Sequence, residues 1–416
     1  MSFGLFRTQH SSVLADFGSA GVKLLQSSLG DKPTAIAAAF VPFTDELRAQ
    51  SIDERFAFLS AELPRVMRDA GFRGNRIVLS PFSQHMLVQH VGVAVADAER
   101  ADAVVGTQIA IGLGCDPTGL VVRTNRVCET SRDGQPKVET IAFAMSRDDV
   151  MRYVDLFKRA KCSVVGVHSE ISALVHAFDH VNRRIEDVNI STMYIDLGYS
   201  GTKVAICHGA QLVFAKSVAI AGRTFDSRIA ESRGISVAQA RVLRLSEGIR
   251  PVRLAPQPAA FAAASADAGL AILRAAVARS GGESAETSVA IGDERRSGMP
   301  PAALGGALPT VNARSIAVEA RETLESLSDE LSMCARYHGA LVRDRRIDRV
   351  VFLGGEARDV GLCQALATAL RLPAKAGDPM ARLCANGTTP AGLPDPEAAH
   401  PGWAVACGLA SSPTDL

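Results

Sequence analysis

The sequence predicts an α/β protein made of two related halves around a cleft, with a small α+β subdomain inserted in the first half. Two observations carry this prediction. The motif Asp-x-Gly-x-x-Gly-x-Lys occurs twice, from Asp16 to Lys23 and from Asp196 to Lys203, and each copy lies between two apolar runs. A further glycine turn, Gly354-Gly355, follows the apolar run 350–353 near the C-terminus. A duplicated half explains the matched pair of motifs, and two ordinary glycine hairpins are the alternative.

Composition excludes several classes of protein. The 416 residues can form two or three domains with a large core. A net charge of +1 provides no field that would recruit nucleic acid or a membrane surface. The eight cysteines include no C-x-x-C pair, which is typical of reduced core thiols in a cytoplasmic protein. Since no apolar run reaches about 18 residues and no signal-peptide pattern is present, we expect no membrane insertion.

Each copy of the motif predicts a β-hairpin with a polar, glycine-rich tip. Glycines let backbone N–H groups approach and surround an anion. A carboxylate repels phosphate, but it can hold a hydrated Mg²⁺ that binds phosphate. The pair of hairpins therefore predicts nucleotide chemistry, with Asp16 and Asp196 as Mg²⁺ ligands through water.

The predicted first half comprises residues 1–83 and 164–190. Its first hairpin and a third strand span 13–43, and the apolar spacing over 52–70 predicts a helix before a strand at 75–80. A helix beginning at Ser169 connects the halves. Its Glu170 is either a water-orienting or metal-bound carboxylate or a glutamate favoured by the helix dipole. His176 and His180 are one helical turn apart, but no third metal ligand is evident.

The inserted subdomain is predicted at 84–163, from alternating strand and helix patterns. The expected strands are 86–91, 119–123 and 137–145, and the expected helices are 96–111 and 148–161.

The second half is predicted at 191–416. A helix opens at Gly222 and stops at Gly234, and Ser236 and Gln239 form a capping box for the next helix. Residues 251–311 are rich in Pro, Ala, Gly and Ser and indicate a surface insertion, either a solvated loop or a partner-binding segment. Helices are expected at 312–342 and 360–370, with a strand at 372–375.

The hairpins resemble the two phosphate loops of the actin-like (ribonuclease H-like) fold shared by actin, chaperone ATPases, sugar kinases and FtsA. Residues 348–361 resemble the adenosine-contacting turn of that fold. Within it the chain resembles PilM, the actin-like protein of type IV pilus assembly, through the run 222–244, the inserted subdomain and Asp378-Pro379. The run departs from the PilM pattern at three positions: Gln239, Arg241 and Arg244.

The resemblance implies ATP or ADP with Mg²⁺ as ligand, and slow hydrolysis at most, with Glu170 as the candidate catalytic group. The implied nucleotide-binding residues are Asp16, Gly18, Ser19, Gly21, Lys23, Asp196, Gly198, Ser200, Gly201, Thr202, Gly222, Gln239, Arg244, Gly354, Gly355 and Glu356.

The resemblance also implies a function. It is a cytoplasmic scaffold of type IV pilus or related type II secretion assembly, which binds a short N-terminal segment of a PilN-like inner-membrane protein and so lies at the inner face of that membrane. Contacts with the pilus motor or with further copies of the chain are implied too. An ATPase or small-molecule kinase and a nucleotide-free protein-binding platform are the alternatives.

Overall fold

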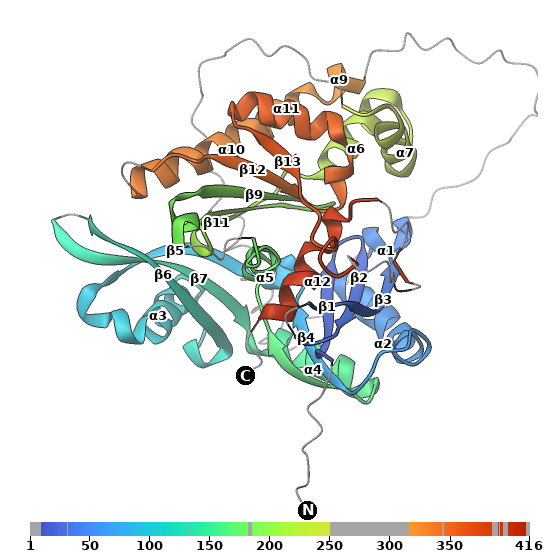
Figure 1. The fold of residues 1–416 in the computed structure, drawn as a ribbon, viewed down its shortest axis with the longest axis horizontal. Helices are drawn as coiled ribbons and strands as arrows, with labels where there is room; N and C mark the ends of the chain where they lie inside the picture. Colours follow the sequence, from blue (N-terminus) through green and yellow to red (C-terminus); the bar gives the residue numbers. More distant parts are fainter. Residues whose placement is uncertain are drawn as a thin grey trace, which may run out of the picture.

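The computed structural model describes residues 10–30, 32–132, 134–181, 185–249, 316–342, 345–384, 390, 392–393 and 398–412 (Figure 1). The expected insertion at 251–311 lies outside the described residues. Among the helices that are described, none is long and apolar enough to cross a membrane.

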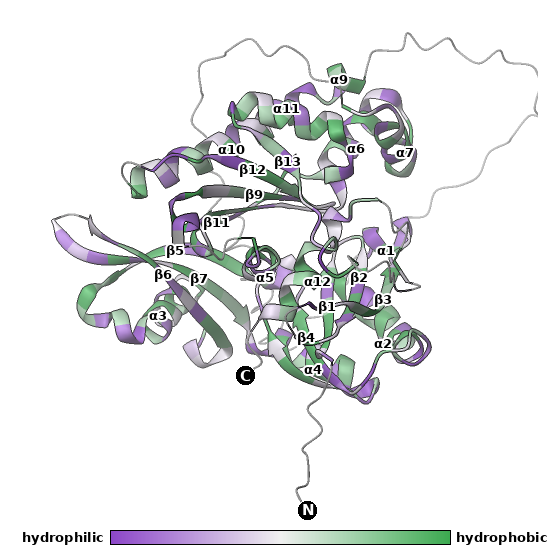
Figure 2. Ribbon diagram, in the orientation of Figure 1, coloured by the Kyte–Doolittle hydropathy of each residue, from purple (hydrophilic) through white to green (hydrophobic). Residues whose placement is uncertain are grey.

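The first half contains a five-stranded sheet with the strand order β3-β2-β1-β4-β8. Strand β2 runs antiparallel to both β1 and β3, whereas β4 runs parallel to both β1 and β8. The strands are largely apolar and buried, because helices cover the sheet (Figure 2). Their bounds are β1 Val13–Gly18, β2 Gly21–Ser27, β3 Ala35–Pro42, β4 Arg76–Ser80 and β8 Ser163–Val167.

The second half repeats this topology in the sheet β11-β10-β9-β12-β13. Its hairpin strands β9, β10 and β11 are antiparallel, and β12 and β13 run parallel to β9. The bounds are β9 Ser191–Leu197, β10 Thr202–His208, β11 Gln211–Val218, β12 Arg349–Leu353 and β13 Ala374–Ala376. The equivalent order and direction of the strands confirm the duplicated α/β fold.

Helices α2 and α4 cover one face of the first sheet, where Phe17 and Phe157 are fully buried in a shared apolar cluster. The helix expected at 52–70 is confirmed as α2, and it begins with a capping box between Ser51 and Glu54. The helices of this half are α1 Asp45–Ala49, α2 Ile52–Asp69 and α4 Arg147–Arg159. Helix α4 is the one expected at 148–161 as part of the inserted subdomain, but its apolar residues pack in the core of the first sheet.

Helices of the second half cover the second sheet on its outer side (Figure 1). Gly234 ends α6 in a left-handed conformation, and the capping box of Ser236 and Gln239 begins α7, both as expected. The helix expected over 312–342 is divided at Ala320, and residues 312–315 are outside the described part. The helices are α6 Gly222–Arg233, α7 Val237–Glu247, α9 Ile316–Glu319, α10 Arg321–Leu341 and α11 Val360–Leu370.

Two short helices, α5 Glu170–His176 and α12 Ala404–Gly408, cross between the two large sheets (Figure 1). They approach so closely that a Cβ atom on Gly408 would lie 1.6 Å from the carbonyl oxygen of Ala173. Only glycine fits there, which confirms the expectation that the small residues of the C-terminal helix permit a close crossing.

A three-stranded sheet β5-β7-β6 with helix α3 lies between β4 and β8 in the chain. The expected helix at 96–111 is instead a 3₁₀ turn at 95–100 followed by α3. The Asp97–Arg100 ion pair spans that turn with the three-residue spacing that 3₁₀ geometry brings into line. The strand expected at 119–123 is longer, because β6 stays paired with β7 beyond its apolar start. The bounds are β5 Leu87–Ala94, β6 Leu120–Arg132, β7 Gln135–Ser146 and α3 Ala101–Leu113.

Short 3₁₀ turns complete the described structure. They are η1 Ser83–His85, η2 Val95–Arg100, η3 Pro117–Gly119, η4 Ile185–Asn189, η5 Gly355–Arg358, η6 Pro401–Trp403 and η7 Leu409–Ser411.

Candidate functional site

The tip of the first hairpin joins β1 to β2. Asp16 and Lys23 are cross-strand partners there, and the Lys23 Nζ donates a hydrogen bond to Asp16 Oδ2 at 3.1 Å. Asp16 is only 6% exposed. Gly21 has no room for a side chain, because a Cβ atom would lie 2.4 Å from the carbonyl oxygen of Val41. The tip therefore brings backbone and an ammonium group to one point, as an anion site requires.

The second hairpin, between β9 and β10, has the equivalent aspartate and lysine as cross-strand partners. Asp196 faces Lys203 across the strands, but their charged atoms are 4.0 Å apart. The Lys203 Nζ lies closer to the carboxylate of Glu170, at 3.0 Å. Helix α6 is attached to this tip, since the N–H of Gly222 donates to the carbonyl oxygen of Gly198.

Glu170 is the first residue of α5, and Ser169 caps that helix by accepting the N–H groups of Ile171 and Ser172. Both interpretations of Glu170 from the sequence are compatible with the structure. The residue begins a helix, and its carboxylate also contacts Lys203 of the second hairpin. Burial raises the pKa of Glu170 above its ordinary value, against the opposing effect of Lys203. The structure assigns this carboxylate an ion pair, and its catalytic role stays a prediction.

The two hairpins act on one another electrostatically. Burial raises the pKa of Asp196, Lys203 opposes the rise, and the charge of Asp16 on the other hairpin adds to it. Burial alone would lower the pKa of Lys203, but the charges of Glu170 and Asp196 raise it above its usual range. Five charged groups from both halves thus form one cluster, which we call the junction cluster: Asp16, Lys23, Glu170, Asp196 and Lys203.

The glycine turn after β12 reaches the same place. Gly354 has φ +87°, and a Cβ atom there would lie 2.4 Å from Asp196 Oδ1. The sequence-predicted turn therefore packs directly against the second hairpin. Glu356, two residues later, is almost fully buried and points into a separate group of charges.

That second group, the arginine network, is centred on Arg244. Its fully buried guanidinium contacts Asp226 at 2.6 Å, Glu356 at 2.6 Å and Asp359 at 3.5 Å. Burial alone would lower the pKa of Arg244, but its hydrogen bond to Asp226 and the charge of Glu356 raise it above its usual range. Arg241 adds contacts to Glu356 at 2.7 Å and to Asp226 at 3.4 Å.

Two side chains that the sequence analysis assigned to nucleotide binding, Arg244 and Glu356, belong to the arginine network. Arg244 and Glu356 bind each other, and Gln239 accepts the N–H of Ser236 as a helix cap on an exposed surface. Gly222 gives Glu356 its space, since a Cβ atom there would lie 2.6 Å from the Glu356 carboxyl carbon. The structure thus brings Arg244, Glu356 and Gly222 together, with Arg244 and Glu356 bonded to each other, and it leaves Gln239 apart on the surface.

Sequence reasoning missed the roles of four residues. Lys203 belongs to the repeated motif, so the repeat itself could have indicated it. Asp226 and Asp359 gave no local signal, because their partner Arg244 is far away in sequence. Arg241 looked only like the loss of an acid, whereas its guanidinium also lies 4.8 Å from the centre of the Tyr199 ring.

Tyr199, at the tip of the second hairpin, connects the two halves. The Arg48 guanidinium of α1, in the first half, lies 5.2 Å from the centre of its ring. A cation over an aromatic face is attractive, so this contact favours the closed arrangement of the halves. The charged side chains behind it are covered, with Asp196 8% and Lys203 9% exposed.

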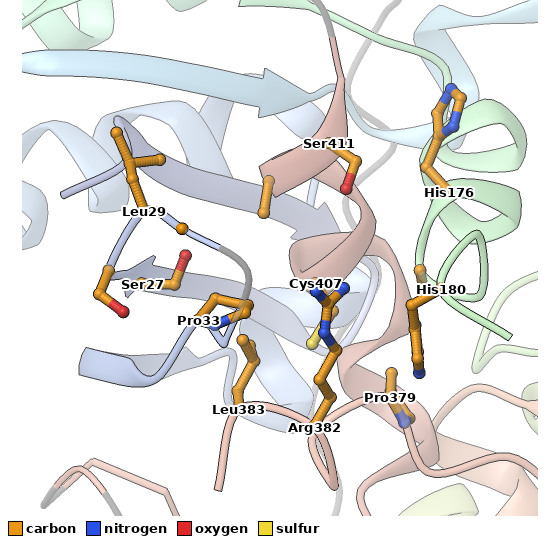
Figure 3. A pocket seen from close by; sticks show the side chains of 14 residues that line it. Ser27, Leu29, Pro33, His176, His180, Pro379, Arg382, Leu383, Cys407 and Ser411 are labelled. Atoms are coloured by element: carbon orange, nitrogen blue, oxygen red, sulfur yellow. The ribbon is translucent and has the colours of Figure 1, made fainter. Parts of the chain in front are cut away.

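A cavity of about 220 Å³ lies elsewhere, beside the end of β2 opposite to the hairpin tip (Figure 3). His176 and His180 both line it, together with Arg382 and Ser411. His176 is hydrogen-bonded to Asp179 at 2.8 Å. Within the described ranges, no three His, Cys, Asp or Glu side chains are grouped as a metal site requires.

Two sheets with the same strand order, joined by crossing helices and meeting at paired hairpins, define the class of protein: the chain has the actin-like fold. The fold is similar to a chain in the structure of a "PilM-PilN type IV pilus biogenesis complex", with a TM-score of 0.67, 15% sequence identity, and coverage of 97% of this chain and 98% of that one.

Two further solved structures are less similar than that chain. The ethanolamine utilization protein EutJ from Carboxydothermus hydrogenoformans gives a TM-score of 0.46 at 12% identity, covering 97% of this chain and 90% of that chain. MreB 5 of Spiroplasma citri bound to AMPPNP gives 0.45 at 11% identity, covering 91% and 94%. No protein-family model matches the chain, and no curated protein matches its sequence.

Proposed function

We propose that this chain is an actin-like scaffold of type IV pilus, or related type II secretion, assembly that binds a short N-terminal segment of a PilN-like inner-membrane protein. The observation that supports it is the similarity, over nearly the full length of both chains, to a chain of a PilM-PilN complex. On this proposal the protein works in the cytoplasm and is held at the inner face of the inner membrane by its partner.

ATP or ADP is the proposed ligand of the junction between the halves. The glycine tips of both hairpins supply backbone N–H groups, and Lys23 and Lys203 supply positive charge within the same cluster. The hydroxyl groups of Ser19, Ser200 and Thr202 belong to these tips as well. Because the cluster is nearly covered, nucleotide entry requires the halves to separate, which couples binding to the angle between them.

Hydrolysis is slow or absent in this proposal. Phosphoryl transfer to water needs a group that positions the attacking water. Glu170 is the candidate, but its Oε2 is 3.0 Å from Lys203 Nζ, and this positive charge weakens the carboxylate as a base toward water.

A second candidate function is a protein-binding platform that uses no nucleotide. The arginine network favours it, because Arg244 and Glu356, two of the side chains assigned to the nucleoside, are bonded to each other. A nucleoside that used these groups would have to break an ion pair in which both side chains are buried.

Calorimetry with ATP and with ADP, combined with a phosphate-release assay, separates these functions. Saturable binding without phosphate release supports the nucleotide-gated scaffold, and steady release supports an ATPase. No heat with either nucleotide supports the platform. An Asp196→Ala variant that binds ATP as the original does would contradict the placement of the nucleotide at the junction.

The partner is tested with a synthetic peptide. It copies the cytoplasmic N-terminal segment of a single-pass membrane protein encoded beside this chain, and a scrambled peptide of equal composition serves as control. Fluorescence anisotropy should show saturable binding of the first peptide only. Equal binding of both, or of neither, would contradict the pilus-scaffold proposal.

A further inference from the structure

The two hairpins carry the same Asp–Lys pair, but the two lysines are used differently. Lys23 bonds to its own cross-strand partner Asp16 at 3.1 Å. Lys203 lies 4.0 Å from its partner Asp196 and has moved toward Glu170, at 3.0 Å. Lys203 therefore lies between two carboxylates that come from different elements, β9 and α5.

The position of Lys203 is that of a counter-ion rather than a surface lysine. Its side chain is 11% exposed, and those of Glu170 and Asp196 are 11% and 12% exposed. A bridging cation between two nearly covered carboxylates offsets a repulsion that would otherwise be large in a poorly solvated site. The carboxylates of Glu170 and Asp196 are thus already neutralised in part by a group of the chain itself.

The sequence prediction of Mg²⁺ does not fit this arrangement well. Mg²⁺ sites in nucleotide-binding proteins use one or two carboxylates that are free to face the ion or its waters. Here Asp16 is paired with Lys23, and Asp196 and Glu170 both face Lys203. A hydrated divalent cation next to Asp196 would lie close to the ammonium group of Lys203 and be repelled by it.

We propose that Lys203 is a built-in counter-cation that takes the place of a divalent metal at the junction, so that the site binds phosphate groups without a stoichiometric Mg²⁺. This inference rests on the proposed nucleotide binding for the identity of the phosphate ligand. The charge argument itself concerns only residues of the chain. The junction cluster contains three carboxylates and two ammonium groups, and removal of the Lys203 ammonium group leaves one. The added negative charge favours a divalent cation beside Asp196 and Glu170.

The first experiment uses Mn²⁺ as a paramagnetic substitute for Mg²⁺ and needs no nucleotide. Free Mn²⁺ is counted by electron paramagnetic resonance during titration of the full chain. We expect Lys203→Gln to bind Mn²⁺ about tenfold or more tightly than the original protein, since a repelling charge has been removed. Lys203→Arg keeps the charge and should behave as the original.

Lys216→Gln is the matched control. Lys216 is also a lysine of the second sheet in an ion pair, with Glu330 at 2.8 Å, but it lies on β11 and outside the junction cluster. It should leave Mn²⁺ binding unchanged. Tight Mn²⁺ binding by the original protein, or no gain in a folded Lys203→Gln variant, would overturn the proposal.

The second experiment measures ATP binding in EDTA and in excess MgCl₂. The original protein should bind ATP equally well in the two buffers, whereas Lys203→Gln should need Mg²⁺. If the original protein binds ATP only with Mg²⁺, the counter-cation proposal is wrong and the proposed nucleotide binding is kept. If ATP binds in neither buffer but Lys203→Gln gains Mn²⁺ affinity as expected, the proposed nucleotide binding is wrong and the counter-cation proposal is kept. The comparison of the two buffers with the original protein needs no variant. The proposal can therefore be overturned even if Lys203→Gln fails to fold.

Discussion

Ion pairs in this molecule have different consequences according to where they lie. The exposed pair between Arg228 and Glu322 is surrounded by water, which weakens it. Arg244, in contrast, is fully buried among Asp226, Glu356 and Asp359. Residues of the second kind cannot be changed singly, because each removal leaves a buried charge without its partner.

Arg244→Met should therefore destabilise the fold by about 3–5 kcal/mol, since it leaves buried carboxylates uncompensated. Urea unfolding followed by circular dichroism measures the change. Arg228→Met, which removes an arginine of the neighbouring helix α6 from exposed ion pairs, is the control and should cost less than about 1 kcal/mol. Equal losses in the two variants would contradict the assigned importance of the buried network.

A buried histidine pair predicts a pH dependence. His208 and His338 face each other with their Nε2 atoms 2.9 Å apart. Burial, followed by the charge of His338, lowers the pKa of His208 from 6.5 to about 4, and burial lowers that of His338. Between these pH values the unfolded chain takes up a proton that the folded chain does not, so stability is full above pH 6.5 and falls as the pH is lowered toward 4.

We expect the free energy of unfolding to fall by about 1–2 kcal/mol between pH 7 and pH 5 through this pair. Chemical unfolding at several pH values measures it. A His208→Gln, His338→Gln double variant removes both titrating groups and should flatten the curve in that range. If the double variant keeps the full slope, the dependence arises from other groups.

At the scale of elements, the crossing of α5 and α12 depends on backbone contact rather than on side-chain packing. Gly408 leaves no space for a Cβ atom beside Ala173. Both helices are short, so neither is stable without this contact. The crossing packs α5, which connects the two halves, against α12, which lies near the C-terminal end of the described residues. This contact helps to set the position of the two large sheets relative to each other.

Gly408→Ala should therefore destabilise the protein by about 1–3 kcal/mol or more, because the added methyl group forces the helices apart. Gly339→Ala is the matched control: Gly339 lies in helix α10, and a Cβ atom there meets nothing within 4 Å. That substitution should be neutral or stabilise by up to about 1 kcal/mol, since alanine favours a helix interior. Thermal unfolding of both variants is the measurement, and a Gly408→Ala protein as stable as the original would exclude the close crossing.

At the scale of the whole molecule, the small subdomain is joined to the second half by polar contacts as well as apolar ones. The Tyr337 hydroxyl of α10 donates to the buried carboxylate of Glu139 on β7, at 3.0 Å. His90 of β5 lies 3.2 Å from the same carboxylate oxygen, and its Nε2 accepts the N–H of Ala215 on β11. The subdomain, although inserted in the first half of the sequence, therefore contacts the second half directly.

Tyr337→Phe should cost about 1–3 kcal/mol, because it removes a hydrogen bond from a buried charged group. Hydrogen exchange measured by mass spectrometry should become faster in β5, β7 and β11 and remain unchanged in the first sheet. A uniform change across the molecule would show that the contact stabilises the fold generally and does not join the subdomain to the second half.

The sequence by itself determined the local features. The Asp-x-Gly-x-x-Gly-x-Lys repeats specified both hairpins, Ser236 specified a helix start, and Gly234 specified a helix end, because each depends on residues a few positions apart. The equivalence of the two repeats was enough to predict the duplicated fold.

Tertiary structure alone decided which charges are paired. Lys203 contacts Glu170 of the connecting helix, and Arg244 contacts Glu356 from beyond the 251–311 segment. Such pairs join groups distant in sequence, and their strength depends on burial, which no local pattern encodes. For this reason the sequence could predict a nucleotide site at the hairpins, but it could not show that lysine and arginine side chains already pair with the carboxylates assigned to it.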